Sequence, residues 1–182
     1  MTMKPADILD YWYSDKMRKH WFASTESLDE EIRNNYQASW QMAADGNLKH
    51  WNTSPEGCLA LSIILDQLPL NMFRNTAKSF STEQLAIETT RHAISMGFDD
   101  NIEKDKRAFL YMPLMHSENM DDQDLSVQMF KKSNLKENLR FAEHHRKIIS
   151  TYGRFPHRNQ ILGRTSTAAE INYLNSDQAF KG

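Results

Sequence analysis

The chain has 182 residues, of which 40% are hydrophobic and 25% are charged, and this composition is ordinary for a soluble globular protein. A formal net charge of -2 argues against general nucleic-acid binding, which usually requires a strongly basic face. The length favours a single domain over residues 1–182 with a substantial buried core.

The cellular location is indicated by what the sequence lacks. Cys58 is the single cysteine, so no internal disulfide can form and a reducing compartment is expected. The longest apolar run, residues 58–65, is far shorter than the roughly 20 residues that span a bilayer. Asp7 interrupts the N-terminal segment before any apolar core, unlike a secretory signal. These features predict a cytoplasmic protein that does not associate with membranes.

Helical patterns follow one another along the chain, and no strand alternation or hairpin turn breaks them. Periodicity and breakers predict helices over residues 5–13, 27–45, 55–68, 81–96, 102–117, 121–132, 136–152 and 167–175. Capping-box spacing to a following Glu or Gln marks three of the starts, at Ser27, Ser81 and Thr167. Because the connections are short, neighbouring helices should pack as antiparallel hairpins. The predicted fold class is all-α.

Residues 152–167, YGRFPHRNQILGRTST, carry positive charge and no carboxylate. The planar fork of an arginine binds a carboxylate or phosphate through two parallel hydrogen bonds, and the helix start at Thr167 also favours an anion. Arg154, His157, Arg158 and Arg164 are therefore candidates to bind an anionic metabolite or a peptide carboxylate. The alternative is that these arginines attach an irregular loop to helix ends and to the acidic residues of 99–124.

Three other places combine histidine or carboxylate with an apolar helix. His116 and Glu118 end such a helix and could form an acid–base pair, or simply close the helix. Asp66 precedes an expected proline turn that leads to Arg74, and it is a candidate catalytic carboxylate, a partner for an arginine, or an ion pair at a helix end. His145 lies in an apolar stripe, so a core histidine with satisfied hydrogen bonds is favoured over a ligand. No metal-binding spacing, Walker loop or dinucleotide fingerprint occurs, so no metal or cofactor is expected.

Three long strings resemble a widespread bacterial family known as domain of unknown function 924. They are LALSIILDQLPLNMFRNTAKSFSTE (59–83), RAFLYMPLMHSENMDDQDLSVQMF (107–130) and HHRKIISTYGRFPHRNQILGRTSTAAE (144–170). The resemblance implies one all-helical domain with tetratricopeptide-like helix pairs, and it implies no established activity. Among the positions that match the family's motifs are Asp66, Gln67, Arg74, His116, Glu118, His145, Arg154, His157, Arg158, Asn159 and Arg164. Leu70 departs from the family, which often has arginine there, and this departure would weaken the site if that arginine binds a ligand.

Two functions are compatible with these residues. The first is a binding module with a pocket for an anionic small molecule or peptide carboxylate, lined by Arg74, His145, Arg154, His157, Arg158, Asn159 and Arg164. The alternative is a hydrolase or transferase for a small anionic substrate. In that enzyme His116 or His157 would be the acid–base group, and Glu118 or Asp66 would orient it. An open groove lined by Arg154, Arg158 and Arg164 would favour the first function, and a closed pocket with a histidine within hydrogen-bond reach of a carboxylate would favour the second. Neither function is expected if residues 153–164 pack flat against the helices with every guanidinium paired internally.

Overall fold

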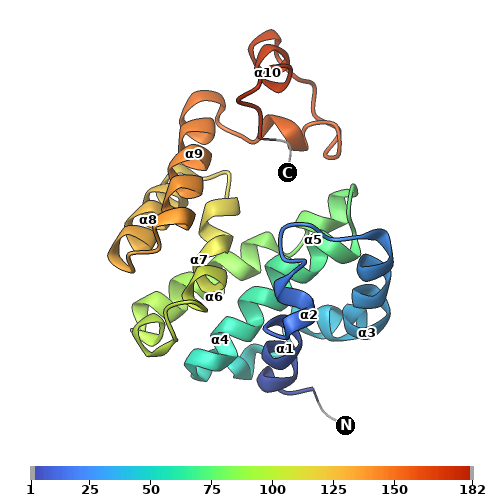
Figure 1. Ribbon diagram of the computed structural model, residues 1–182, viewed down its shortest axis with the longest axis vertical. Coiled ribbons are helices and arrows are strands. Elements are labelled where there is room, and N and C mark those ends of the chain that lie inside the picture. The colour runs from blue at the N-terminus through green and yellow to red at the C-terminus, as the bar shows by residue number, and fades with distance from the viewer. Residues whose placement is uncertain (1–2, 181–182) are drawn as a thin grey trace.

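The computed structural model describes residues 3–180, and this part of the chain contains helices and turns but no strand (Figure 1). The all-α prediction is confirmed. The α-helices are α1 (Pro5–Trp12), α2 (Asp15–Arg18), α3 (Glu26–Ala44), α4 (Pro55–Ser62), α5 (Leu68–Met72), α6 (Glu83–Ser95), α7 (Arg107–His116), α8 (Met120–Lys132), α9 (Lys136–Tyr152) and α10 (Ala168–Leu174). Between them lie four 3₁₀ turns, η1 (Lys49–Thr53), η3 (Ala77–Phe80), η4 (Phe98–Asn101) and η5 (Pro156–Arg158), and one π turn, η2 (Ile63–Gln67).

Two of the three predicted capping boxes are wrong. Thr167 forms its box with Glu170 as expected. The N-cap of α3 is Thr25 instead of Ser27, and that of α6 is Thr82 instead of Ser81. Both helices therefore begin at a threonine next to or near the serine that the spacing favoured.

Pro69 lies inside a continuous helical run from α4 to α5 and not in a turn. Because proline has no N–H, the carbonyl of Leu65 loses its usual donor four residues further on. The hydroxyl of Thr82 donates to this carbonyl instead, at 2.6 Å. The N–H of Leu68 bonds to the carbonyl of Ile63, five residues back, which is the geometry of a π turn. The expected proline turn before Arg74 is therefore wrong.

The main core surrounds α7, in which every residue from Ala108 to Met115 is buried. This helix packs against α4, α6, α8 and α9, and the buried cluster extends from Ile8 in α1 to Ala142 in α9. α7 begins at Arg107 and not near residue 102, because residues 104–106 form a turn. Within residues 3–180, no helix has both the length and the apolar character that crossing a membrane requires.

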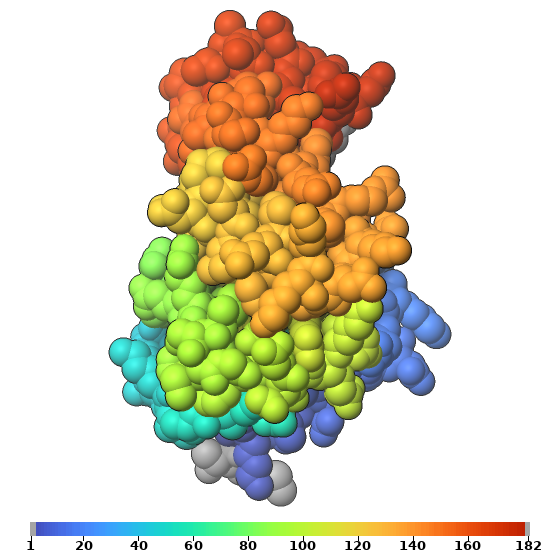
Figure 2. Space-filling model, turned by 90° about the vertical axis from the view of Figure 1, so that its left-hand side faces the viewer, coloured from blue at the N-terminus to red at the C-terminus, as the bar shows by residue number. Residues whose placement is uncertain are grey.

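The C-terminal segment, residues 153–180, packs on a second and smaller apolar cluster. Its buried members are Ile148, Ile149 and Phe155. No residue of 153–180 belongs to the main core cluster. Figures 1 and 2 show this segment at the end of the molecule opposite the N-terminus, beyond the α8–α9 hairpin. Its attachment to the main body, helices α1–α7, therefore depends on side chains outside the main core. That the whole chain forms one domain stays a prediction.

Gly57 lies where α4 passes the backbone of the preceding turn. A Cβ atom built here would stand 1.9 Å from the carbonyl oxygen of Trp51, and a backbone atom cannot move aside as a flexible side chain could. We expect Gly57→Ala to lower the free energy of unfolding by about 3 kcal/mol, at the upper end of overpacked cores.

Gly97→Ala is the matched control for this steric effect. Gly97 has a φ of +67° but no atom within 4 Å of a built Cβ, so only the left-handed backbone opposes the substitution. Its expected cost is about 1 kcal/mol. Urea unfolding followed by far-UV circular dichroism measures both variants, and equal losses would contradict the steric explanation.

Candidate functional site

Asp66 and His116 form a carboxylate–imidazole pair between the π turn and the last residue of α7. Nδ1 of His116 lies 2.9 and 3.0 Å from the two carboxylate oxygens of Asp66. Gln67 donates its side-chain amide to the same carboxylate at 2.5 Å. Asp66 is only 5% exposed, so these two partners fix its orientation. A carboxylate that accepts from Nδ1–H leaves the lone pair of the neutral ring on Nε2.

The second ring nitrogen of His116 is open. No residue among 3–180 forms a hydrogen bond with Nε2, and the side chain is 19% exposed. An imidazole held at Nδ1 by a buried carboxylate and open at Nε2 has the arrangement of a general acid–base. The sequence singled out both residues, and the fold brings them together.

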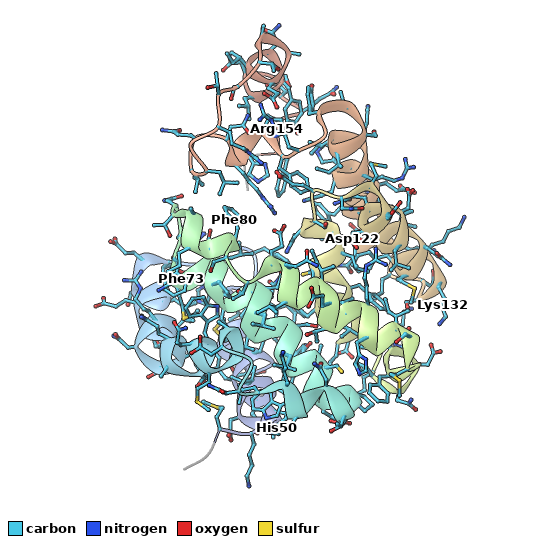
Figure 3. All side chains as sticks on the ribbon, turned by 180° about the vertical axis from the view of Figure 1, so that it is seen from behind. His50, Phe73, Phe80, Asp122, Lys132 and Arg154 are labelled. Atoms are coloured by element: carbon cyan, nitrogen blue, oxygen red, sulfur yellow. The ribbon has the colours of Figure 1, made fainter. Side chains whose placement is uncertain are left out.

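Arg158 connects the C-terminal segment to this pair. Its Nη1 donates to Oε2 of Glu83, and its Nη2 donates to the backbone carbonyl of His116, each at 2.8 Å. The guanidinium carbon lies 4.4 Å from the ring centre of Phe80 and 4.7 Å from that of Phe155. Figure 3 shows Phe80 on the face of the main body that is turned toward the C-terminal segment. Arg158 is thus buried at the junction, with only 6% of its surface exposed.

Arg164 and Glu118 form a second connection at the same junction. Nη1 and Nη2 of Arg164 donate to the two oxygens of Glu118 at 2.6 and 2.9 Å, and the N–H of Phe155 also donates to this carboxylate. Burial alone would raise the pKa of Glu118, but Arg164 and the Phe155 N–H outweigh burial and lower that pKa. Glu118 is therefore the partner of an arginine and does not pair with His116.

Arg154 and Glu170 form a third ion pair, within the C-terminal segment. Nε and Nη2 of Arg154 donate to the two oxygens of Glu170 at 2.6 and 2.9 Å. The hydrogen bonds from Arg154 are the largest cause that lowers the pKa of Glu170, to about 2. Asn159 joins this pair to the previous one, since it donates to Glu170 and accepts from Arg164.

Each of the three arginines of the basic stretch is thus bonded to a carboxylate of the chain itself. The partners of Arg154, Arg158 and Arg164 are Glu170, Glu83 and Glu118. These contacts agree with the alternative interpretation in that the arginines attach the loop to internal carboxylates and to a helix-end carbonyl. Of the three carboxylates, however, only Glu118 lies within the expected acidic residues 99–124. A role for them in ligand binding stays a prediction.

Two histidines of the predicted site lie beside aromatic rings. His145 is 3% exposed and donates from Nδ1 to the backbone carbonyl of Phe141 at 2.8 Å. Its ring packs against Phe180 at a centroid distance of 4.5 Å. Burial is the main cause that lowers the pKa of His145 to about 3 and that of His157 to about 4. Both rings are therefore neutral at pH 7. Within residues 3–180, no group of three or more His, Cys, Asp or Glu side chains is placed to hold a metal ion.

Arg74 lies in a separate contact of the main body. Its Nε and Nη2 donate to the two oxygens of Asp29 in α3 at 2.6 and 3.1 Å, and Nη2 also donates to Asn71. No residue of 153–180 bonds to it, so the structure does not place Arg74 with the other candidates. Asp66, in turn, pairs with an imidazole and with no arginine.

Sequence reasoning did not single out two residues of the junction, Glu83 and Phe80. Glu83 is a first-turn carboxylate of α6, which the helix dipole explains without any tertiary partner. Burial raises the pKa of Glu83, although the charges of Arg158 and His116 act in the opposite direction. No spacing rule connects residue 83 with residue 158, so only the fold reveals this contact.

Fold and site together define an all-helical protein in which a buried aspartate and a partly exposed histidine form a pair beside the C-terminal segment with its three arginines. The chain belongs to the DUF924 family of bacterial proteins of unknown function, whose model matches residues 8–178. It is similar to a solved structure of a protein of unknown function, ATU0120 from Agrobacterium tumefaciens. The two are 35% identical with a TM-score of 0.89, over 94% of this chain and 96% of that one. No curated protein matches the chain significantly. The family resemblance is thereby confirmed, while the tetratricopeptide-like arrangement of helix pairs stays an expectation.

Proposed function

We propose that the protein is an enzyme of the hydrolase or transferase class, with His116 as the general acid–base and Asp66 as its orienting carboxylate. The observation that carries this proposal is the 2.9 Å contact between Nδ1 of His116 and Asp66, with Nε2 open. Of the catalytic candidates, Glu118 is engaged by Arg164, and His157 has no carboxylate partner among residues 3–180. A cytoplasmic location belongs to the same proposal.

The geometry supports a separate role for each residue of the site. Nε2 takes a proton from an attacking water or hydroxyl group, and Asp66 stabilises the imidazolium that forms. The same nitrogen then returns the proton to the leaving group. Gln67 holds Asp66 in place, and Arg158 holds the backbone carbonyl of His116. Base catalysis of this kind contributes roughly 10²–10⁴-fold to a rate.

The test compares hydrolysis of ester, phosphate, amide and glycoside chromogenic substrates by wild type and two variants. His116→Gln and Asp66→Asn are each expected to lose about 10²–10⁴-fold in kcat/KM. The control is His50→Gln, a substitution of the same kind at an exposed position, and it should leave kcat/KM unchanged. Full activity in His116→Gln would refute the proposal. So would side-chain ¹⁵N spectra in which the proton of neutral His116 resides on Nε2.

The anion-binding module is a second proposal, favoured by an open depression beside the start of α10. The depression measures about 580 Å³, and Arg154, Thr167 and Glu170 line part of it. Arg154 already binds Glu170 through two hydrogen bonds, so a guest anion would have to compete with an internal carboxylate. For this reason we place it after the acid–base site. Stabilisation of the wild type by inorganic phosphate, lost in Arg154→Ala, would favour the module.

A further inference from the structure

The terminal guanidinium nitrogens around His116 and the amide nitrogen of Gln67 each already donate one hydrogen bond to an internal acceptor. Nη1 and Nη2 of Arg158 donate to Glu83 and to the His116 carbonyl, and its Nε is buried without a partner. Arg164 donates both terminal nitrogens to Glu118. Gln67 donates its amide to Asp66. The site therefore offers a guest no free guanidinium or amide fork.

Three acceptors are left over. They are Nε2 of His116, Oε1 of Gln67 and Oε1 of Glu83, and no residue among 3–180 donates to any of them. Each of the three atoms lacks a partner but is not fully buried, so each is accessible to solvent. Gln67 is only 6% exposed, which fixes the direction of its amide oxygen. We name these three atoms the acceptor cluster.

One network of hydrogen bonds holds the acceptor cluster together. Gln67 and His116 both bond to Asp66, and Arg158 bridges Glu83 and the His116 carbonyl. The cluster thus combines the end of α7, the π turn and the start of α6, which are far apart in the sequence.

The charges of the site, like its free acceptor atoms, favour a ligand that carries hydrogen-bond donors and a positive charge. Three carboxylates, those of Asp66, Glu83 and Glu118, face two guanidinium groups, those of Arg158 and Arg164. Among these five side chains the carboxylates outnumber the guanidinium groups by one. A cation is favoured in such a site, and an anion is repelled.

We infer that the acceptor cluster binds a ligand through N–H or O–H donors, and that the ligand is a small aliphatic amine or amino alcohol. This inference rests on the proposed function at His116 and names its substrate class. In an amino alcohol the hydroxyl group at Nε2 is then the group whose proton the imidazole takes. A small anion, which the basic stretch indicated when taken alone, does not match the free atoms or the charge.

The test uses wild-type protein and three probes with the same four-carbon chain: 1,4-diaminobutane, 1,4-butanediol and succinate. Binding is followed by NMR through the side-chain signals of His116 and Gln67. The diamine is expected to shift these signals and to bind at least about tenfold more tightly than the diol, because its hydrogen bonds are charge-assisted. Succinate is expected to leave them unmoved. Saturation of the same signals by succinate, or no response to any probe, would overturn the inference.

A matched pair of variants places the probe at the cluster. Glu83→Gln removes the charge and keeps the shape, and it is expected to weaken diamine binding about tenfold. Glu88→Gln makes the same change at an exposed position of α6 and should bind like wild type. Unchanged binding in Glu83→Gln would overturn the inference. If that variant does not fold, the comparison of three probes on the wild type still decides.

Binding is measured here without turnover, which separates the two proposals. If the protein prefers the diamine but shows no His116-dependent activity, the inference about the ligand is supported and the proposed enzyme function is refuted. If it shows His116-dependent activity but prefers succinate, the enzyme function is supported and the inference about the ligand is refuted.

Discussion

Arg158→Ala is expected to lower the free energy of unfolding by about 3–5 kcal/mol, the cost of removing one partner from a buried ion pair. The substitution leaves the Glu83 carboxylate and the His116 carbonyl without their donor at the junction. It also opens a gap between the rings of Phe80 and Phe155, which now enclose the guanidinium. Equilibrium urea unfolding at pH 7 measures the loss.

Two comparisons show whether this loss comes from burial and bridging. Arg140→Ala removes an arginine whose side chain is 77% exposed and whose partner Glu137 is 79% exposed, and it should change stability by less than about 0.5 kcal/mol. Arg158→Lys keeps the charge but cannot donate from two fixed nitrogens, so an intermediate loss is expected. An Arg158→Ala variant as stable as Arg140→Ala would show that the C-terminal segment is held by other contacts.

The buried position of Arg158 also explains why its sequence context was ambiguous. The stretch 152–167 contains no carboxylate, and positive charge without local compensation indicates a site for an external anion. The compensating carboxylates lie outside the stretch, with Glu83 separated from Arg158 by 75 positions and Glu118 from Arg164 by 46. Charge patterning along a chain detects only near neighbours, so it could not distinguish a ligand clamp from an internal connection.

Capping and periodicity rules predicted the helix bounds more accurately than they predicted the contacts of the site residues. Helix α9 was predicted over residues 136–152 and ends there, because Gly153 takes the left-handed backbone that closes it, with a φ of 71°. The prediction failed at Pro69, where the missing N–H is compensated by Thr82, a residue separated from Leu65 by 17 positions. Where a helix depends on a hydrogen-bond partner that is distant in sequence, as at Pro69, the residues of the helix alone do not predict its course.

The Asp–His pair was predicted only in part: both residues were candidates, but their pairing was one of several. His116 was singled out because it lies two residues from Glu118 at the end of an apolar helix, and Asp66 as a candidate partner of an arginine or catalytic carboxylate. Their separation of 50 positions meant that several pairings were equally consistent with the sequence. The fold selects one of them, and by the same contacts it assigns Glu118 to Arg164.

The second large expected effect is a loss of stability in mild acid caused by His145. Burial lowers its pKa to about 3 in the folded protein, whereas an exposed histidine of the unfolded chain has a pKa near 6.5. Below pH 6.5 the unfolded state therefore binds a proton that the folded state does not bind. Stability is complete above this pH and falls as the pH decreases toward 3. From pH 7 to pH 4 the contribution of this one residue is about 3 kcal/mol.

The measurement is urea unfolding at pH 7, 6, 5 and 4 for wild type and His145→Asn. Asparagine keeps a polar group near the carbonyl of Phe141 but does not titrate, so the variant should lose about 3 kcal/mol less than wild type over this range.

The variant is less stable at pH 7, because it loses the ring that packs against Phe155 and Phe180. The exposed His50 provides the control, and His50→Asn should keep the wild-type slope. His157, whose pKa is lowered to about 4, and Glu170, whose pKa is lowered to about 2, act in the same direction and contribute to the slope that remains. Glu118, whose pKa is also lowered, adds to this slope, and Glu83, whose pKa is raised, opposes it. Parallel curves for wild type and His145→Asn would mean that the ring of His145 accepts a proton without leaving the folded state.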